Sequence, residues 1–242
     1  VTPDRVVISP GTSPALMLAF AALLEPGDEV ILSNPYYACY PNFIRFVDGV
    51  PQAVATHEEE GFQLTAAEIA RRIGPRTRAI LINSPANPTG CLISPAELQA
   101  ICELGPTVVS DEIYHGLVYE GQEASALQFS DEAFVLDGFS KRFAMTGFRL
   151  GWMVAPRRFI PALQRLQQTL FISANDFVQA AGLAALRHAA PDVERMRQVF
   201  AQRRSFVLGR LAELGIASRA YPTGAFYALA DLRAYTSDSL SF

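Results

Sequence analysis

One lysine stands out among the residues that could do chemistry. The chain contains 20 Lys and Arg residues, and Lys141 is its only lysine, so the other 19 are arginines. A desolvated lysine can lose its proton and form a Schiff base with a carbonyl carbon, whereas arginine stays protonated. A solvated surface lysine is the ordinary alternative. The apolar run before Lys141 and the Gly/Phe/Met/Thr loop around it argue against that alternative.

A second candidate site lies where the first expected helix begins. The turn Pro10-Gly-Thr-Ser-Pro14 separates a strand-like run from an apolar helical run. Ser13 is expected to be the N-cap and Pro14 the first helical residue. The backbone N–H groups at such a helix start can hold a phosphate. A capped turn without a ligand is the alternative, and on its own this turn favours that alternative.

The elements that must position these residues alternate between strand and helix, which predicts an α/β fold with a doubly wound, mostly parallel sheet. Ligands of such sheets bind at the carboxyl ends of the strands, and the unusual loops of this chain follow expected strands. Thr65 and Ser94 begin capping boxes of two short helices. Strands are expected over residues 5–9, 29–33, 52–56, 78–83, 107–110, 133–137 and 150–155.

The pattern becomes helical after Arg157, and a domain change is expected near residue 190. Residues 1–190 are predicted to form a large ligand-binding domain and residues 191–242 part of a small C-terminal domain. A long amphipathic helix is expected over 191–214 and a strand pair within 218–231, around Pro222-Thr-Gly224. The chain begins at Val1, directly before a strand, so we expect it to be a piece of a longer protein.

Composition excludes several classes of function. A net charge of −4 gives no indication of a basic surface that would bind nucleic acid or an anionic membrane. Three scattered cysteines read as reduced thiols of a cytoplasmic protein. The chain has only three histidines, and they are far apart in the sequence, so we expect no zinc site and no other metal. No run is long enough to cross a bilayer, and no signal peptide is visible.

Four strand-end loops together carry a phosphate-binding helix start, an Asn, an Asp with a Tyr three residues on, and a Lys with an Arg eight residues on. The motifs of nicotinamide sites, P-loops and Ser-His-Asp hydrolases do not match. The set suits a phosphorylated aromatic aldehyde that forms a Schiff base with the lysine and pairs its ring nitrogen with the carboxylate. That cofactor is pyridoxal 5′-phosphate.

The sequence also resembles the class I/II aminotransferases, the aspartate aminotransferase-like group of fold type I enzymes. The resemblance implies the fold type I large domain, with a seven-stranded type of sheet flanked by helices, and part of the small α+β domain. No single piece is specific, but together they follow the family's order over nearly the whole chain. The matching pieces are Ser9-Pro-Gly-Thr-Ser-Pro-Ala-Leu16, Asn34-Pro-Tyr-Tyr37, Asn83-Ser-Pro-Ala-Asn-Pro-Thr-Gly90, Ser110-Asp-Glu-Ile-Tyr114, Phe139-Ser-Lys141, Ala144-Met-Thr-Gly-Phe-Arg-Leu-Gly151 and Pro222-Thr-Gly-Ala-Phe-Tyr227.

The resemblance implies a role for each matching residue. Three residues would be catalytic. Lys141 would be the Schiff-base lysine and the proton carrier, and Asp111 would pair with the pyridinium nitrogen. Tyr114 would be the third. Asn87 and Tyr114 would hydrogen-bond the ring oxygen. Tyr37 would stack on the ring, with Tyr36 as the alternative. Cofactor phosphate would be held by Thr12, Ser13, Arg149 and Ser140. Gly138 stands where aspartate aminotransferases often carry a phosphate-binding Ser, which leaves that contact in doubt.

The resemblance implies an aminotransferase of amino-acid metabolism that moves an amino group between an L-amino acid and a 2-oxo acid. A β-lyase on the same site and a non-catalytic, pyridoxal phosphate-binding regulatory domain are the alternatives. The full-length protein is expected to be a homodimer. The resemblance implies that this chain lacks the family's N-terminal arm and the arginine that clamps the substrate carboxylate, so the activity of this chain alone is left open.

Overall fold

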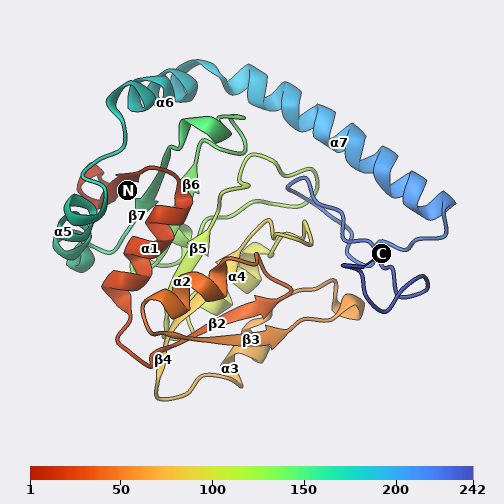
Figure 1. The fold of residues 1–242 in the computed structure, drawn as a ribbon, viewed down its shortest axis with the longest axis horizontal. Coiled ribbons are helices and arrows are strands. Elements are labelled where there is room, and N and C mark those ends of the chain that lie inside the picture. The colour runs from red at the N-terminus through yellow and green to blue at the C-terminus, as the bar shows by residue number, and fades with distance from the viewer. Residues whose placement is uncertain (242) are drawn as a thin grey trace.

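The computed structural model describes residues 1–241, which form one seven-stranded sheet flanked by helices (Figure 1). The strand order across the sheet is β1-β7-β6-β5-β4-β2-β3. β7 runs antiparallel to both neighbours, and the other pairs are parallel, so the predicted mostly parallel α/β sheet is confirmed. The strands are β1 Val6–Ser9, β2 Glu29–Asn34, β3 Val50–Ala55, β4 Thr77–Asn83, β5 Thr107–Asp111, β6 Phe134–Gly138 and β7 Gly151–Val154.

Successive side chains of each strand point to opposite faces of the sheet, and helices bury both faces. In β4, Leu81 joins the cluster on one face and Ile80 the cluster on the other. The first face is covered by α1 (Thr12–Leu23), α2 (Tyr40–Phe46) and α5 (Ile160–Leu170). The second face is covered by α3 (Ala66–Ala70) and α4 (Pro95–Cys102). The short 3-10 helices are η1 Pro3–Arg5, η2 Glu58–Glu60, η3 Ala126–Gln128, η4 Thr146–Phe148 and η5 Arg157–Phe159.

Two of the three expected helix starts are confirmed. The hydroxyls of Thr65 and Ser94 accept hydrogen bonds from the backbone N–H groups three residues on, each at 3.2 Å. The expectation for α1 is wrong, because α1 begins at Thr12 with Gly11 as its N-cap. Gly11 has φ 101° and ψ 170°, a conformation open essentially to glycine alone. The helix therefore begins two residues earlier than an N-cap at Ser13 would place it.

The C-terminal part consists of α6 (Asp176–His188), α7 (Ala190–Glu213) and the segment that follows. Figure 1 shows α7 as a long helix at the margin of the molecule, and it has no buried residue. Polar contacts fasten it: Arg197 donates to the carbonyl oxygen of Val118 at 3.3 Å, and Arg204 to that of Pro222 at 2.9 Å. Among residues 1–241, no helix is long and apolar enough to cross a membrane.

The strand pair expected within 218–231 does not form two full strands, although one antiparallel bridge joins Ser218 to Ala230. Only isolated bridges form in the described chain, between Ser218 and Ala230 and between Val118 and Gly224. The reason is that this segment pairs with a distant loop: Tyr119 N–H donates to the carbonyl oxygen of Thr223 at 2.8 Å. Around Thr223 the backbone groups are thereby satisfied by the distant loop, and the local pairing is limited to the Ser218–Ala230 bridge. The domain division at residue 190 stays a prediction.

Candidate functional site

A cavity of about 250 Å³ lies at the carboxyl ends of the parallel strands. It is lined by all nine residues that the sequence analysis proposed for the site: Thr12, Ser13, Tyr37, Asn87, Asp111, Tyr114, Ser140, Lys141 and Arg149. These residues come from five separate segments of the chain, and each segment begins where a strand ends. The parallel topology therefore brings them to one place.

The amine and the carboxylate are held by neighbouring strands. Lys141 follows β6, and its Nζ lies 5.7 Å from the ring centroid of Tyr114. Asp111 ends β5 and is only 4% exposed. Burial raises the pKa of Asp111 to about 6, although a hydrogen bond from the hydroxyl of Tyr40 at 2.7 Å opposes that rise. Ile113 N–H donates to its other oxygen at 3.2 Å.

A chain of hydrogen bonds joins the ends of β4 and β5. Asn83 Nδ2 donates to the main-chain oxygen of Asp111 at 2.8 Å, and Asn83 Oδ1 accepts from the backbone N–H of Asn87 at 2.7 Å. Asn87 Nδ2 donates to the hydroxyl of Tyr227 at 3.1 Å. The hydroxyls of Tyr227 and Tyr114 lie 2.5 Å apart. Burial is the main cause that raises the pKa of Tyr114 above its usual value. This network places two donors, an amide and a phenol, side by side on the cavity wall.

The opposite end of the cavity is suited to an anion. Thr12 and Ser13 occupy the first turn of α1, where backbone N–H groups have no partner within the helix. The guanidinium of Arg149 lies over this turn: a Cβ on Gly11 would come 2.6 Å from Arg149 Nη2. Arg149 Nη1 lies 3.5 Å from Ser140 Oγ and donates to the carbonyl oxygen of Thr146 at 2.8 Å. The backbone N–H groups of a helix start and a guanidinium are both groups that can hold a phosphate.

The two adjacent tyrosines of the second loop lie differently. Tyr37 is among the residues that line the cavity, whereas Tyr36 is not. Tyr36 is half-buried against the core cluster beside α1 and α2. The ring of Tyr37 meets the ring of Tyr40 edge to face, with centroids 5.3 Å apart. Of the pair, Tyr37 is thus the one placed to stack on a ligand.

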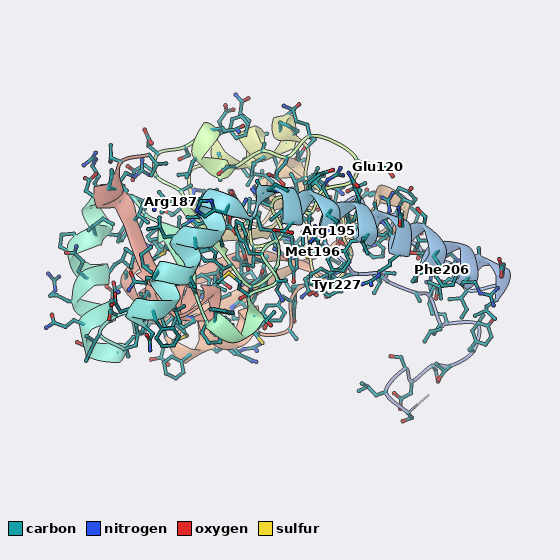
Figure 2. The ribbon with its side chains drawn as sticks, turned by 90° about the horizontal axis from the view of Figure 1, so that it is seen from above. Glu120, Arg187, Arg195, Met196, Phe206 and Tyr227 are labelled. Carbon is teal, nitrogen blue, oxygen red and sulfur yellow. The ribbon has the colours of Figure 1, made fainter. Side chains whose placement is uncertain are left out.

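Sequence reasoning assigned no role to three further residues of this site, Tyr40, Asn83 and Tyr227, which also line the cavity. Tyr40 is three residues after Tyr37, a spacing that puts both on one side of a helical turn. Asn83 begins the motif Asn83–Gly90 and Tyr227 ends the motif Pro222–Tyr227, so the sequence did contain a signal for both. Figure 2 labels Tyr227 near the middle of the molecule, alongside α7. Within residues 1–241, no group of three or more His, Cys, Asp or Glu side chains could hold a metal ion.

Comparison with known proteins decides the family. The model of "Aminotransferase class I and II" matches residues 1–241. The chain belongs to this family. The aspartate/prephenate aminotransferase of Thermus thermophilus is 37% identical over 248 residues, which cover 99% of this chain and 64% of the relative. The valine–pyruvate aminotransferase of Mycobacterium tuberculosis is 39% identical over 249 residues, which cover 100% of this chain and 64% of that relative.

Solved structures show the same fold. The aspartate aminotransferase of Thermus thermophilus with maleate superposes with a TM-score of 0.97 at 37% identity, over 100% of this chain and 65% of that one. The fold type I architecture is therefore confirmed. The chain spans less than two thirds of the length of the relatives named here. The aspartate/prephenate aminotransferase and the valine–pyruvate aminotransferase are named for different substrates, so membership in this family leaves the substrate of this chain open.

The residues of the cavity fit the cofactor that this family uses in general, pyridoxal phosphate. Its aldehyde requires an amine, its ring nitrogen an anion, its ring oxygen hydrogen-bond donors, and its phosphate a cationic or N–H-rich cradle. Lys141, Asp111, the Asn87–Tyr114 pair and the Arg149 end of the cavity supply these groups in one space.

Proposed function

We propose that the protein is a pyridoxal phosphate-dependent aminotransferase that moves an amino group between an L-amino acid and a 2-oxo acid. One observation carries the proposal: the only lysine of the chain, a buried carboxylate and the first turn of α1 line the same cavity. Family membership supports the same reaction class.

Each group of the cavity would hold one part of the cofactor. Thr12, Ser13, Ser140 and Arg149 would bind the phosphate, and Tyr37 would lie against the ring. Bound pyridoxal phosphate supplies an electron-accepting ring, which makes the proton on the α-carbon of an amino acid removable. Asp111 would keep the ring nitrogen protonated, because an adjacent carboxylate favours the cationic form.

Lys141 would act twice. Its Nζ would bind the aldehyde carbon in the resting protein, and after the substrate amine takes its place, the free amine would remove the α-proton. The hydroxyl of Tyr114 and Nδ2 of Asn87 would donate hydrogen bonds to the ring oxygen. These donors and Asp111 lie on the side of the cavity formed by β4 and β5, which would fix the ring orientation relative to Lys141.

The finer parts of the proposal concern assembly and location. We include a homodimer, which is supported by the exposed apolar side chains Phe177, Leu183 and Leu186 on α6. We also include residues 191–242 as part of a small domain, supported by the absence of buried residues from α7. A cytoplasmic location is supported by the three free cysteines of the described chain.

The experiment compares the protein with its Lys141→Ala variant. Pyridoxal phosphate should give the unmodified protein a visible absorbance that L-amino acids change, and a panel of L-amino acids with a 2-oxo acid acceptor should yield new amino and oxo acids. The variant should show neither response. A variant that keeps both would refute the role of Lys141. Ammonia with pyruvate as products would instead indicate a β-lyase, and a spectral change without turnover would indicate a regulatory domain.

A further inference from the structure

We propose that Tyr40 is a positioning residue that organises two sides of the cofactor cavity at once. Its hydroxyl holds the carboxylate of Asp111, and its ring supports the ring of Tyr37. The inference rests on the proposed function, because Asp111 and Tyr37 are given cofactor-binding roles there. Tyr40 itself would act on the cofactor through these two partners.

The first contact is a buried hydrogen bond. Tyr40 Oη donates to Asp111 Oδ2 at 2.7 Å, and the two residues are 3% and 4% exposed. In the described part of the chain, Tyr40 is the only side chain that donates to this carboxylate. A hydrogen bond to a buried charged group is stronger than one between neutral groups. Its loss therefore removes the only side-chain donor that residues 1–241 offer to a carboxylate that is 4% exposed.

The second contact is made by the ring of the same side chain. The rings of Tyr37 and Tyr40 meet at 86°, with centroids 5.3 Å apart. Tyr40 is the first residue of α2, and its backbone N–H donates to the carbonyl oxygen of Tyr37 at 3.0 Å. The backbone and the ring thus both fix Tyr37. An edge-to-face arrangement at this centroid distance is one that pairs of aromatic rings prefer.

The charge on Asp111 depends on several neighbours. Burial and Glu112 disfavour the ionised carboxylate, whereas the hydroxyl of Tyr40, Ile113 N–H and Lys141 favour it. Tyr37, Tyr114 and Asp137 also lie within its field. The balance raises the pKa of Asp111 to about 6, so the group is mostly ionised at pH 7. Removal of the Tyr40 hydroxyl would shift this balance toward the neutral acid.

The test starts from Tyr40→Phe, which removes the hydroxyl and keeps the ring. Carbon-13 NMR of the cofactor-free protein follows the carboxyl of Asp111. Loss of a hydrogen bond to a charged group should raise the pKa of Asp111 by about 1 to 2. Tyr221→Phe is the matched control, since Tyr221 is exposed and its hydroxyl donates to Glu120 away from the cavity. That control should leave the pKa of Asp111 unchanged.

Cofactor affinity separates the two contacts. If pyridoxal phosphate binds the ionised form, Tyr40→Phe should weaken binding about two- to tenfold at pH 7 and less than about twofold at pH 9.5. Tyr40→Leu removes the ring as well, so its affinity relative to the unmodified protein should stay reduced at pH 9.5. An unchanged pKa of Asp111 in Tyr40→Phe would overturn the first contact. Equal affinities of Tyr40→Leu and the unmodified protein at pH 9.5 would overturn the second.

Two further measurements keep the test decisive. If Tyr40→Phe alone unfolds, the substitution is repeated in an Asp111→Asn background, where the unpartnered carboxylate is gone and folding should be restored; failure to restore it counts against the carboxylate contact. If the unmodified protein binds no pyridoxal phosphate, the proposed function is refuted. The NMR titration needs no cofactor and still decides whether Tyr40 controls Asp111.

Discussion

Gly11→Ala is expected to disable the anion end of the cavity while leaving the fold in place. The substitution adds one methyl group at the N-cap of α1. That carbon would lie 2.6 Å from Nη2 and 3.3 Å from Cζ of Arg149, distances that real Cβ atoms rarely show. Either the guanidinium moves away from the helix start, or the turn opens. Both outcomes separate Arg149 from Thr12 and Ser13.

The structure allows the two effects to be sized separately. Gly11 has φ 101° and ψ 170°, so an alanine there should cost about 1–3 kcal/mol of stability from backbone strain. Displacement of Arg149 should remove a hydrogen bond between charged groups, worth about 1.5–3 kcal/mol. Because about 1.4 kcal/mol corresponds to a factor of ten, pyridoxal phosphate should bind about 10- to 150-fold more weakly.

Gly61→Ala is the matched control. Gly61 also has a positive φ, 64°, but nothing lies within 4 Å of the position of an added Cβ. It should therefore lose about 1–2 kcal/mol of stability from backbone strain alone and keep its cofactor affinity. Denaturant unfolding of the cofactor-free proteins measures the stability, and absorbance titration with pyridoxal phosphate measures the affinity. Equal affinities for the two variants would refute the assignment of the Gly11–Arg149 corner to the phosphate.

Three other predictions concern the remaining walls of the cavity. Lys141→Arg keeps the positive charge but cannot give up its proton, so transamination should fall by at least about 100-fold, and a variant with near-normal turnover would contradict the proton-transfer role. Burial raises the pKa of Asp111 to about 6 from 3.8, so the folded protein binds this proton more tightly than the unfolded chain and loses stability as pH rises from about 4 to about 6. Asp111→Asn should remove about 2 to 2.5 kcal/mol of the stability difference between cofactor-free unfolding curves measured at pH 4 and pH 7, and an unchanged pH dependence would count against it. Tyr227→Phe removes the partner of both Asn87 Nδ2 and the Tyr114 hydroxyl, so it should cost about 1–3 kcal/mol without cofactor and less with it, because the ring oxygen can then accept both bonds; the same cost in both unfolding experiments would exclude this explanation.

The sequence predicts those parts of the site that depend on one strand and the loop after it. Asp111 and Lys141 each follow an apolar run, and parallel strands bring such ends together. The start of α1 could not be placed from residue preferences, because Ser13 is a good N-cap in general and only the backbone shows that Gly11 makes the turn.

Hydrogen-bond partners that lie far apart in the sequence could not be predicted for a different reason. Tyr40 bonds to a residue 71 positions away, and Tyr227 to one 140 positions away. Local periodicity carries no information on such pairs. The segment around Thr223 has the composition of a hairpin, yet it pairs with Tyr119 instead. Tertiary contacts overrode local preference there.

The helix α7 has a consequence for how the protein responds to proteases. Its 24 residues include none that is buried, and Arg197 and Arg204 donate hydrogen bonds from it to the backbone carbonyl oxygens of Val118 and Pro222. Helices with little packing open at low cost in free energy. A protease should therefore cut this helix before it reaches the sheet. The cut would leave Tyr227 in place, because the backbone N–H groups of Thr223 and Gly224 donate to the carbonyl oxygen of Gly90, so a nicked protein would keep the cavity around Lys141.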